Sequence, residues 1–546
     1  MIKVRSVLAR ANSRLSLQWA AALLASSTLI SSMLGLYRDR LLNGLYYDSF
    51  PASLSAYRAA FAIPDFMFFI LVSGALSVTF LPVFNERLAA GNRKSAWELS
   101  SSMINFMAMI TLVASVLIMI FAEPLVNYVV APGLSEAGRG LAISMMRVIA
   151  VNPFLFAVAT VIASMQQAIG RFTFYTLAPV IYNIGIIIGI QFFTGGITLF
   201  GHQIFGGGIM GVALGVVLGS VMQLVVSAIG LGGMGFDYSF KIFWRNRGFR
   251  KVLRLLPARS IDQGADYVNG FVEYNLASRI SDRAITAYAQ AQTLHLVPIN
   301  LIGVAISTAA FPKMTEHLGS GRPDLFRKDL QKMLRVIIWL ALPVTTISYF
   351  ARGYLVNFVK NGGAQLISDV LGALVVAILA RSIYHIAARS FYAQQDTKTP
   401  LFISLFSIGL NIVLAIWFTM GLGLGVVGLA AAQSIMAVIE VIILFVIMSH
   451  RIPRLFDRPF IGAIGSMVAA TGLMSVVTYL SVILFQLQNR DMSFFSTFPK
   501  FAIIVIVSAG AYLWLSHLFK LREARPILRR IEKLLFGPPP ARVTKE

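Results

Sequence analysis

Charged residues inside long apolar segments are the features of this sequence that could do chemistry. The first apolar segment ends in Arg38-Asp39-Arg40, and the second contains Arg58 and Asp65. An ionisable side chain in a membrane span costs about 3 kcal/mol unless it is paired or faces water. We therefore expect a hydrated cavity with charges of both signs, and we assign Arg40 to the snorkelling or structurally paired class. Arginines in such a cavity suit an anionic group such as a pyrophosphate, so we predict substrate contacts by Arg38, Asp39, Arg58 and Asp65.

A second polar stripe lies in the segment LARSIYHIAARSFYA. It carries Arg381, His385 and Arg389 at spacings of four, which place them on one helical face. We predict that Arg381 contacts substrate and that His385 lies in the cavity. A histidine can titrate near neutral pH, although a hydrogen-bonded structural histidine is the alternative. Arg389, near the end of the segment, reads as a snorkelling or paired side chain, and Glu440 lies two segments later.

The seventh segment, RSIDQGADYVNGFVEYNLASR, is amphipathic. Asp262, Asp266 and Glu273 share one broad helical face with Asn269. These carboxylates would either neutralise the cavity arginines or bind a coupling proton or sodium ion. We therefore predict Asp262, Asp266 and Glu273 as coupling or cavity residues.

The elements that must position these charges are membrane spans. Of the 546 residues, 57% are hydrophobic and 13% are charged, whereas a soluble chain carries about 25% charged residues. About fourteen apolar segments are long enough to cross a bilayer, and the one from 17 to 37 reads as an uncleaved first helix. The fold class predicted is an all-α polytopic membrane protein, with spans centred near 27, 70, 110, 154, 186, 220, 268, 300, 343, 378, 409, 435, 472 and 507.

The basic residues indicate the orientation. The net charge is +23, and Lys and Arg cluster in alternate loops and at both ends of the chain. Basic loops face the cytoplasm, so we predict a multi-pass membrane protein with both termini inside. This distribution favours the lipid bilayer over nucleic acid as the partner of the positive charge. The absence of cysteine excludes disulfides and thiolate metal sites.

An internal repeat links the second and eighth segments, six spans apart. Both contain [ST]-A-Y, then Pro, Gly and S-x4-P-x3-E, so that Ser77, Pro82 and Glu86 match Ser307, Pro312 and Glu316. An even offset keeps the chain direction, which predicts two lobes in parallel pseudo-repeat, a transporter architecture. Chance similarity between apolar helices is the alternative.

The predicted organisation has six parts. They are a basic cytoplasmic N-terminus (1–16), an N-lobe (17–235), a basic cytoplasmic linker (236–257), a C-lobe (258–450), a last pair of spans (451–517) and a basic cytoplasmic tail (518–546).

Motifs of enzyme chemistry are missing. The sequence contains no Walker A loop, no HExxH and no GxSxG. We expect a transporter without cofactor or metal, although an embedded transferase could also place carboxylates at the interface. The glycine-rich GGGIMG and GLGLG lie beside apolar segments, where close helix packing explains them better than phosphate binding.

Two stretches resemble the MurJ/MviN family of lipid II flippases, in the MOP exporter superfamily. The stretch from SSMLGLYRDR to FLPVFNE is similar to the opening of that family, and ARSFYAQQDTKTP resembles its Y-A-x-x-D-T-K-T-P loop between the tenth and eleventh spans. The resemblance implies two-lobed alternating access that moves undecaprenyl-pyrophosphate-linked peptidoglycan precursor from the inner to the outer leaflet. The loop matches at Tyr392, Asp396, Thr397, Lys398, Thr399 and Pro400.

Several positions depart from the family pattern. Arg38 and Asp39 match the family's R-D pair, and Arg58 would replace a lost cation one helical turn away. Asn411 matches an asparagine that contributes to sodium binding in some members, but the acidic residue one turn later is Ala415. Family charges are replaced at Ser32, Ser55, Ala62, Phe68, Ser73 and Thr293.

Three functions follow as hypotheses. The first is a lipid II flippase coupled to the membrane potential, H+ or Na+, with cell-wall synthesis proteins as potential partners. The second is a flippase for another lipid-linked saccharide or a related MOP-type antiporter. The third is a non-transporting MurJ-like scaffold, which the missing family charges would explain.

Overall fold

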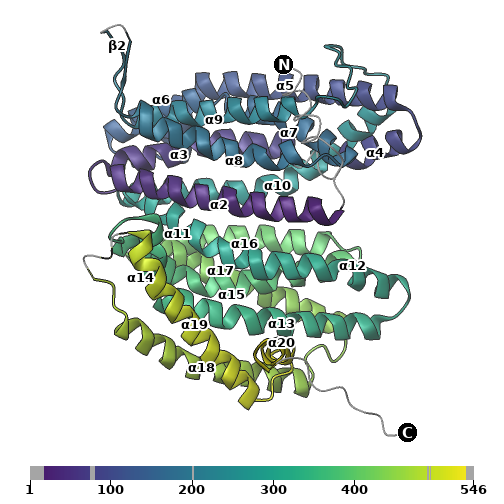
Figure 1. Ribbon diagram of the computed structural model, residues 1–546, viewed down its shortest axis with the longest axis vertical. Helices are drawn as coiled ribbons and strands as arrows, with labels where there is room; N and C mark the ends of the chain where they lie inside the picture. Colours follow the sequence, from purple (N-terminus) through teal and green to yellow (C-terminus); the bar gives the residue numbers. More distant parts are fainter. Residues whose placement is uncertain (1–16, 74–79, 200–201, 489–490, 492, 537–546) are drawn as a thin grey trace. The chain divides into compact units, whose positions relative to one another are not determined.

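The computed structural model describes residues 17–73, 80–199, 202–488, 491 and 493–536. The chain divides into two compact units, Met1–Thr286 and Ala287–Glu546. Within each unit, long helices lie side by side (Figure 1). The described residues are almost entirely helical, which confirms the predicted all-α class.

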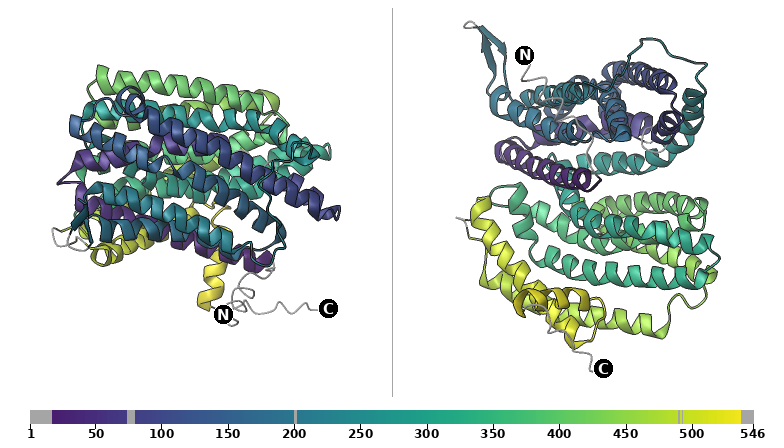
Figure 2. Two further views of the ribbon diagram at one scale, coloured as in Figure 1. Left: turned by 90° about the horizontal axis from the view of Figure 1, so that it is seen from above. Right: turned by 45° about the vertical axis from the view of Figure 1, so that its right-hand side comes forward.

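The first unit holds nine α-helices and one hairpin among its described residues. Three of the helices end in a π-helical turn, and the antiparallel hairpin β1–β2 stands clear of the helices of its unit (Figure 2). The elements are α2 (Leu17–Tyr46), α3 (Pro51–Phe68), η1 (Phe69–Ser73), α4 (Leu81–Ala89), α5 (Arg93–Pro124), η3 (Leu125–Val130), α6 (Glu136–Ile149), α7 (Asn152–Ile169), α8 (Thr173–Ile188), η4 (Gly189–Phe193), β1 (Ile197–Leu199), β2 (His202–Phe205), α9 (Ile209–Ile229) and α10 (Arg247–Ile280).

The second unit is also built of long helices, and two of them end in a π-helical turn. Its elements are α11 (Ala284–Ile299), which begins just before the boundary, η5 (Asn300–Val304), α12 (Ala305–Gly319), α13 (Pro323–Phe350), α14 (Arg352–Val359), α15 (Gln365–Ala393), α16 (Lys398–Ile416), η6 (Trp417–Gly421), α17 (Gly425–Arg451), α18 (Arg458–Leu484), α19 (Phe494–Leu518) and α20 (Arg525–Phe536).

Twelve helical segments of the described chain are long and apolar enough to cross a membrane. They are α3–η1, α5–η3, α6–α7, α8–η4, α9, α11–α12, α13, α15, α16–η6, α17, α18 and α19. The two other predicted spans, centred near 27 and 268, coincide with α2 and α10, which are long helices outside this set. The count of fourteen therefore stays a prediction.

The repeated segments have the same local structure in both units. In the first unit, a π-helical turn follows α3 and a left-handed Gly91 precedes α5; in the second, a π-helical turn follows α11 and a left-handed Gly321 precedes α13. The two glycines are as far apart in the sequence as the matched Pro82 and Pro312. Glycine suits both positions because a side chain would strain a positive φ. Ser77 of the predicted match lies outside the described residues.

The predicted lobes and the observed compact units assign α10 to different halves of the chain. α10 contacts α3, α4 and α5, so it belongs to the first unit, whereas the sequence assigned most of it to the C-lobe. The final pair α18–α19 packs against α13 within the second unit. The division into N-lobe, linker, C-lobe and final pair remains a prediction.

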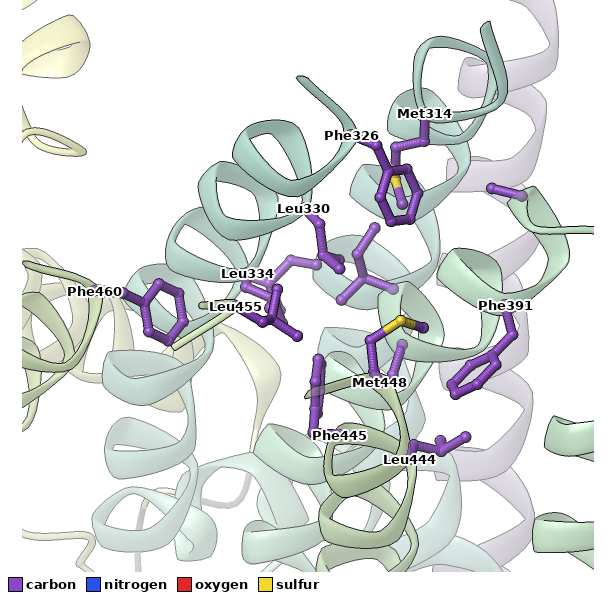
Figure 3. Close-up of a cluster of buried hydrophobic side chains, with 14 of the residues drawn as sticks. Met314, Phe326, Leu330, Leu334, Phe391, Leu444, Phe445, Met448, Leu455 and Phe460 are labelled. Carbon is purple, nitrogen blue, oxygen red and sulfur yellow. The ribbon is translucent and has the colours of Figure 1, made fainter. Parts of the chain in front are cut away.

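An apolar cluster holds the end of α15 in the second unit. Phe391 of α15 lies among buried side chains of α12, α13 and α17, including Met314, Phe326, Leu330 and Met448 (Figure 3). Between membrane helices such side chains hold their places through close packing rather than through removal from water. The cluster therefore sets which face of α15 is left for polar contacts.

Candidate functional site

Arg38, Asp39 and Arg58 meet in the first unit. Arg38 Nη2 lies 2.9 Å from Asp39 Oδ1, and Arg58 Nη2 lies 3.2 Å from Asp39 Oδ2. The carboxylate is thus shared between α2, which carries Arg38 and Asp39, and α3, which carries Arg58. We call these three residues the arginine cluster. The structure brings together three of the residues that the sequence predicted for substrate contact.

A second set of polar groups orients Arg38. Its Nη1 donates to Asn183 Oδ1 at 3.1 Å, and Asn183 Nδ2 donates to Ser31 Oγ at 3.2 Å and to the Pro179 carbonyl at 3.1 Å. Asn183 lies on α8 and is buried. Sequence reasoning missed it, although an amide inside the apolar run APVIYNIGII was a usable signal.

The arginine cluster retains unused donor capacity. The side chains of Arg38, Asp39 and Arg58 are 20%, 4% and 15% exposed, so the carboxylate is far less accessible than the guanidinium groups. Nε of Arg58 is buried and has no hydrogen-bond acceptor among the described residues. Two cations share one anion, so the cluster carries one net positive charge. Such a site can accept the oxygens of a phosphate or carboxylate group.

The other predicted acids of the first unit do not join this ion-pair network. Asp65, on α3, has no ion-pair or hydrogen-bond partner among the described residues. Glu273 is buried on α10 and accepts a hydrogen bond from Asn269 at 2.8 Å, one turn earlier. The side chains of Asp262 and Asp266 lie outside the part of the structure that is described, so their predicted role stays a prediction.

Arg381 belongs to a different network, in the second unit. Its Nη1 lies 2.9 Å from Glu440 Oε2, and Glu440 Oε1 accepts from Ser404 Oγ at 2.9 Å. Ser404 Oγ in turn lies 3.1 Å from Tyr384 Oη. Glu440 is buried on α17, with its side chain 2% exposed against 30% for Arg381. A buried carboxylate needs such a partner, which explains why these two charges tolerate an apolar setting.

The rest of the α15 stripe borders a cavity of about 300 Å³. We call it the α15 cavity, and it is lined by Phe311, Tyr384, His385, Ala388, Arg389 and Tyr392. The predicted cavity residue His385 and the family-loop residue Tyr392 therefore lie together. Arg389, which the sequence assigned to a snorkelling or paired class, lies beside them.

The family-like loop is a compact capping structure. The Asp396 carboxylate accepts from the Thr399 hydroxyl at 2.6 Å and from the backbone N–H groups of Thr399 and Lys398, at 3.0 and 3.1 Å. Arg451, at the end of α17, lies 2.7 Å from the same carboxylate. These contacts, the Thr399 hydroxyl foremost, lower the pKa of Asp396 to about 2. Asp396 thus stays ionised and fixes the start of α16, where Pro400 is buried, whereas Thr397 and Lys398 are exposed.

Metal-binding capacity is limited in the described part of the chain. No group of three or more His, Asp or Glu residues lies close enough there to hold a metal ion. Asn411 is buried on α16, and Ala415, one turn later, is also buried. A methyl group cannot ligate a cation, so sodium binding at Asn411 would need ligands other than the family's acid.

Comparisons with known proteins identify the family of this chain. The family model described as "Lipid II flippase MurJ" matches residues 51–520. The "Probable lipid II flippase MurJ" of Thermotoga maritima is 23% identical over 509 residues, which are 92% of this chain and 97% of that protein. The protein of the same description from Bdellovibrio bacteriovorus is 23% identical over 526 residues, or 93% and 96% of the two chains.

Solved structures show the same fold. "Lipid II flippase MurJ, inward closed conformation" matches with a TM-score of 0.73 at 24% identity, covering 93% of this chain and all of that one. A multidrug resistance MATE family transporter of the MOP superfamily, in an inward-facing conformation, matches with a TM-score of 0.66 at 17% identity and covers 80% of this chain and 99% of that one. At these identities the likeness establishes the fold alone. The family model, which spans most of the sequence, shows that the chain belongs to the MurJ family of multi-pass membrane proteins.

Proposed function

We propose that this protein is a lipid II flippase: a membrane transporter, not an enzyme, that moves undecaprenyl-pyrophosphate-linked peptidoglycan precursor from the inner to the outer leaflet of the bacterial cytoplasmic membrane. The family model and the curated relatives carry the name lipid II flippase. The observation that carries the proposal in this chain is the arginine cluster, with one net positive charge inside an apolar bundle.

The arginine cluster suits the pyrophosphate of the headgroup. Arg58 Nε is buried and has no hydrogen-bond acceptor among the described residues, and a phosphate oxygen would accept a hydrogen bond from it. Charge-assisted hydrogen bonds of this kind are about twice as strong as neutral ones. Asp39 holds both guanidinium groups in place before the substrate arrives. Because the carboxylate is buried and satisfied by two cations, it can give up one arginine to the phosphate without losing its last partner.

Transport would proceed by alternating access of two repeated lobes, with both termini in the cytoplasm. The headgroup would cross with the arginine cluster, while the undecaprenyl tail stays in the bilayer. No Walker A loop supplies ATP coupling, so we propose that a gradient drives the cycle, either the membrane potential or H+ or Na+. A positive site that moves with a negative headgroup changes the charge carried across the membrane, and the potential acts on that charge.

A non-transporting scaffold is the second candidate function. Uncharged residues at Ala62 and Thr293, where the family has cations, favour it. Cell-wall synthesis proteins would then be the partners.

Translocation of lipid II by the purified protein in liposomes tests the proposal. We expect wild type to translocate, and Arg38→Ala and Arg58→Ala to reduce the rate at least about tenfold, the loss that one charged hydrogen bond implies. Arg147→Ala is the matched control, because Arg147 is an exposed arginine of the same unit whose one hydrogen bond among the described residues goes to the Met119 carbonyl. The same liposomes with an imposed potential, pH gradient or sodium gradient identify the coupling.

Two outcomes would contradict the proposal. Wild-type protein that moves no lipid II under any gradient would support the scaffold. Translocation unaffected by Arg38→Ala, Asp39→Ala and Arg58→Ala would remove the arginine cluster from the mechanism.

A further inference from the structure

The α15 cavity presents an uncompensated cation and a histidine inside a pocket with aromatic walls. Tyr384, His385, Ala388, Arg389 and Tyr392 follow one another at helical spacing and line one face of α15. The adjoining faces carry Ile386, Ala387 and Phe391 into the apolar cluster of Figure 3, where Phe391 is labelled. The core packing therefore holds the polar face of α15 toward the cavity.

The two polar groups of the cavity differ from Arg381 on the same stripe. Arg381 is neutralised by Glu440 at 2.9 Å. Among the residues that the structure describes, neither Arg389 nor His385 has an ion-pair or hydrogen-bond partner. The ring of His385 lies beside the Tyr384 ring, at 5.7 Å between centroids, and close to Gly303. The half-buried guanidinium of Arg389 can therefore bind an anion from outside the protein.

A helix of the first unit that ends in the same kind of turn as α15 carries no such polar stripe. The helices α7 and α15 both end in a Schellman motif, with left-handed Gly170 and Gln395 at the same motif position. Counting back from these residues, His385 and Arg389 correspond to Thr160 and Ser164 of the first unit.

The hydroxyl groups of Thr160 and Ser164 form hydrogen bonds within their own helix. Thr160 Oγ1 donates to the Phe156 carbonyl at 2.6 Å, and Ser164 Oγ donates to the Thr160 carbonyl at 2.8 Å. In α7 these hydroxyl groups thus have acceptors within the helix, whereas Arg389 and His385 of α15 have no hydrogen-bond partner among the described residues. The difference between two copies of one scaffold points to a role beyond folding.

We propose that the α15 cavity is a second headgroup subsite, which binds an anionic group of the transported precursor through Arg389 and His385. The proposal rests on the proposed function and deepens it. A volume of about 300 Å³ accommodates a carboxylate with its adjoining peptide or sugar atoms. Phe311, Tyr384 and Tyr392 supply apolar and ring contacts to those atoms. The anion is either a carboxylate of the headgroup peptide or the pyrophosphate, which share this chemistry.

Ligand binding to the full chain in lipid nanodiscs tests the subsite. Three probes are compared: lipid II, lipid II with its peptide carboxylates amidated, and undecaprenyl pyrophosphate. We expect Arg389→Gln to weaken lipid II binding about tenfold and Arg389→Lys to weaken it less, because lysine keeps the charge but loses the planar fork. Lys328→Gln is the matched control: it removes an exposed cation from the same unit outside the cavity.

The probes identify the source of the anion. If a peptide carboxylate binds, wild type loses affinity for the amidated probe and Arg389→Gln leaves undecaprenyl pyrophosphate binding unchanged. If the pyrophosphate binds, Arg389→Gln weakens all three probes. A thermal unfolding midpoint close to that of wild type shows that the variant is folded, and Arg389→Lys supplies a second, volume-conserving variant.

Two results would overturn the subsite, and they are distinguishable. Wild type that binds lipid II while Arg389→Gln binds all probes equally well overturns the subsite alone. Wild type that binds none of the three probes overturns the proposed function and the subsite with it.

Discussion

Arg335 and Glu523 form a two-pronged ion pair, with Nε 2.6 Å from Oε1 and Nη2 3.2 Å from Oε2. The pair joins α13 to the segment that follows α19, and the two side chains are only 17% and 8% exposed. Trp339, one turn along α13, donates from its ring nitrogen to Ser516 Oγ at 3.0 Å. The last spans are thus fastened to the second unit by polar contacts as well as by the apolar cluster around Met467 and Tyr512.

Removing one partner of this pair should destabilise the protein. Glu523→Ala leaves the Arg335 charge half-buried without compensation, and breaking a buried pair costs about 3 kcal/mol. We expect a clear fall in the thermal unfolding midpoint in detergent. Asp324→Ala is the control, because its pair with Arg322 is exposed and screened by solvent and should contribute little. Equal effects of the two substitutions would show that the Arg335–Glu523 pair does not stabilise the last spans.

The Asp396 loop should show a pH-dependent contribution to stability. The pKa of Asp396 is about 2 in the folded protein, below the value of about 3.9 for an unfolded chain. The ionised form therefore favours folding; its contribution is complete above pH ~4 and disappears as the pH falls toward 2. Asp396→Asn removes this titration, so its unfolding midpoint should lie below wild type at pH 6 and approach it at pH 3. A gap that stays constant over this range would contradict the assignment.

Glycine pairs let α8 and α9 approach closely. A Cβ atom on Gly185 would lie 2.3 Å from the Gly219 Cα, and one on Gly215 would lie 2.6 Å from the Gly189 Cα. Small residues allow such contact between membrane helices. We expect Gly215→Ala and Gly185→Ala to lower the folded yield and the unfolding midpoint, because backbone must move away from backbone. Gly472→Ala, in α18, has open space around the new methyl group and should be neutral; matching losses at Gly472 would refute the packing explanation.

The Arg381–Glu440 pair should respond asymmetrically to substitution. Glu440 is 2% exposed and Arg381 30%, so Arg381→Ala leaves a buried carboxylate, whereas Glu440→Ala leaves a cation that can reach water. We expect Arg381→Ala to cost about 3 kcal/mol and Glu440→Ala less. The double substitution should recover part of the loss, as a thermal double-mutant cycle would show. Additive losses would mean that the two residues do not interact.

The sequence predicted the arginine cluster only in part. Arg38 and Asp39 are neighbours in the chain, and Arg58 lies on the next helix, so an ion pair among them could be anticipated from charge in an apolar setting. The sequence marked Asn183 as a polar residue in an apolar run, but its contact with Arg38 could not be anticipated, because that contact depends on how α2 and α8 pack. In the same way Asp65, charged and close in sequence to Arg58, has no ion-pair partner among the described residues.

Membrane class, the positions of the spans and the parallel repeat follow from the sequence by itself. Hydropathy and length are properties of local segments, so the fourteen apolar runs all fall on helices, and the repeated Pro82 and Pro312 lie on matching elements. Tertiary structure alone decided which charges are neutralised. Arg381 and Arg389 occupy the same stripe, yet among the described residues a carboxylate lies beside Arg381 alone, because α17 places Glu440 there. The angular position of a distant helix is set by packing, which hydropathy and spacing along one segment do not encode.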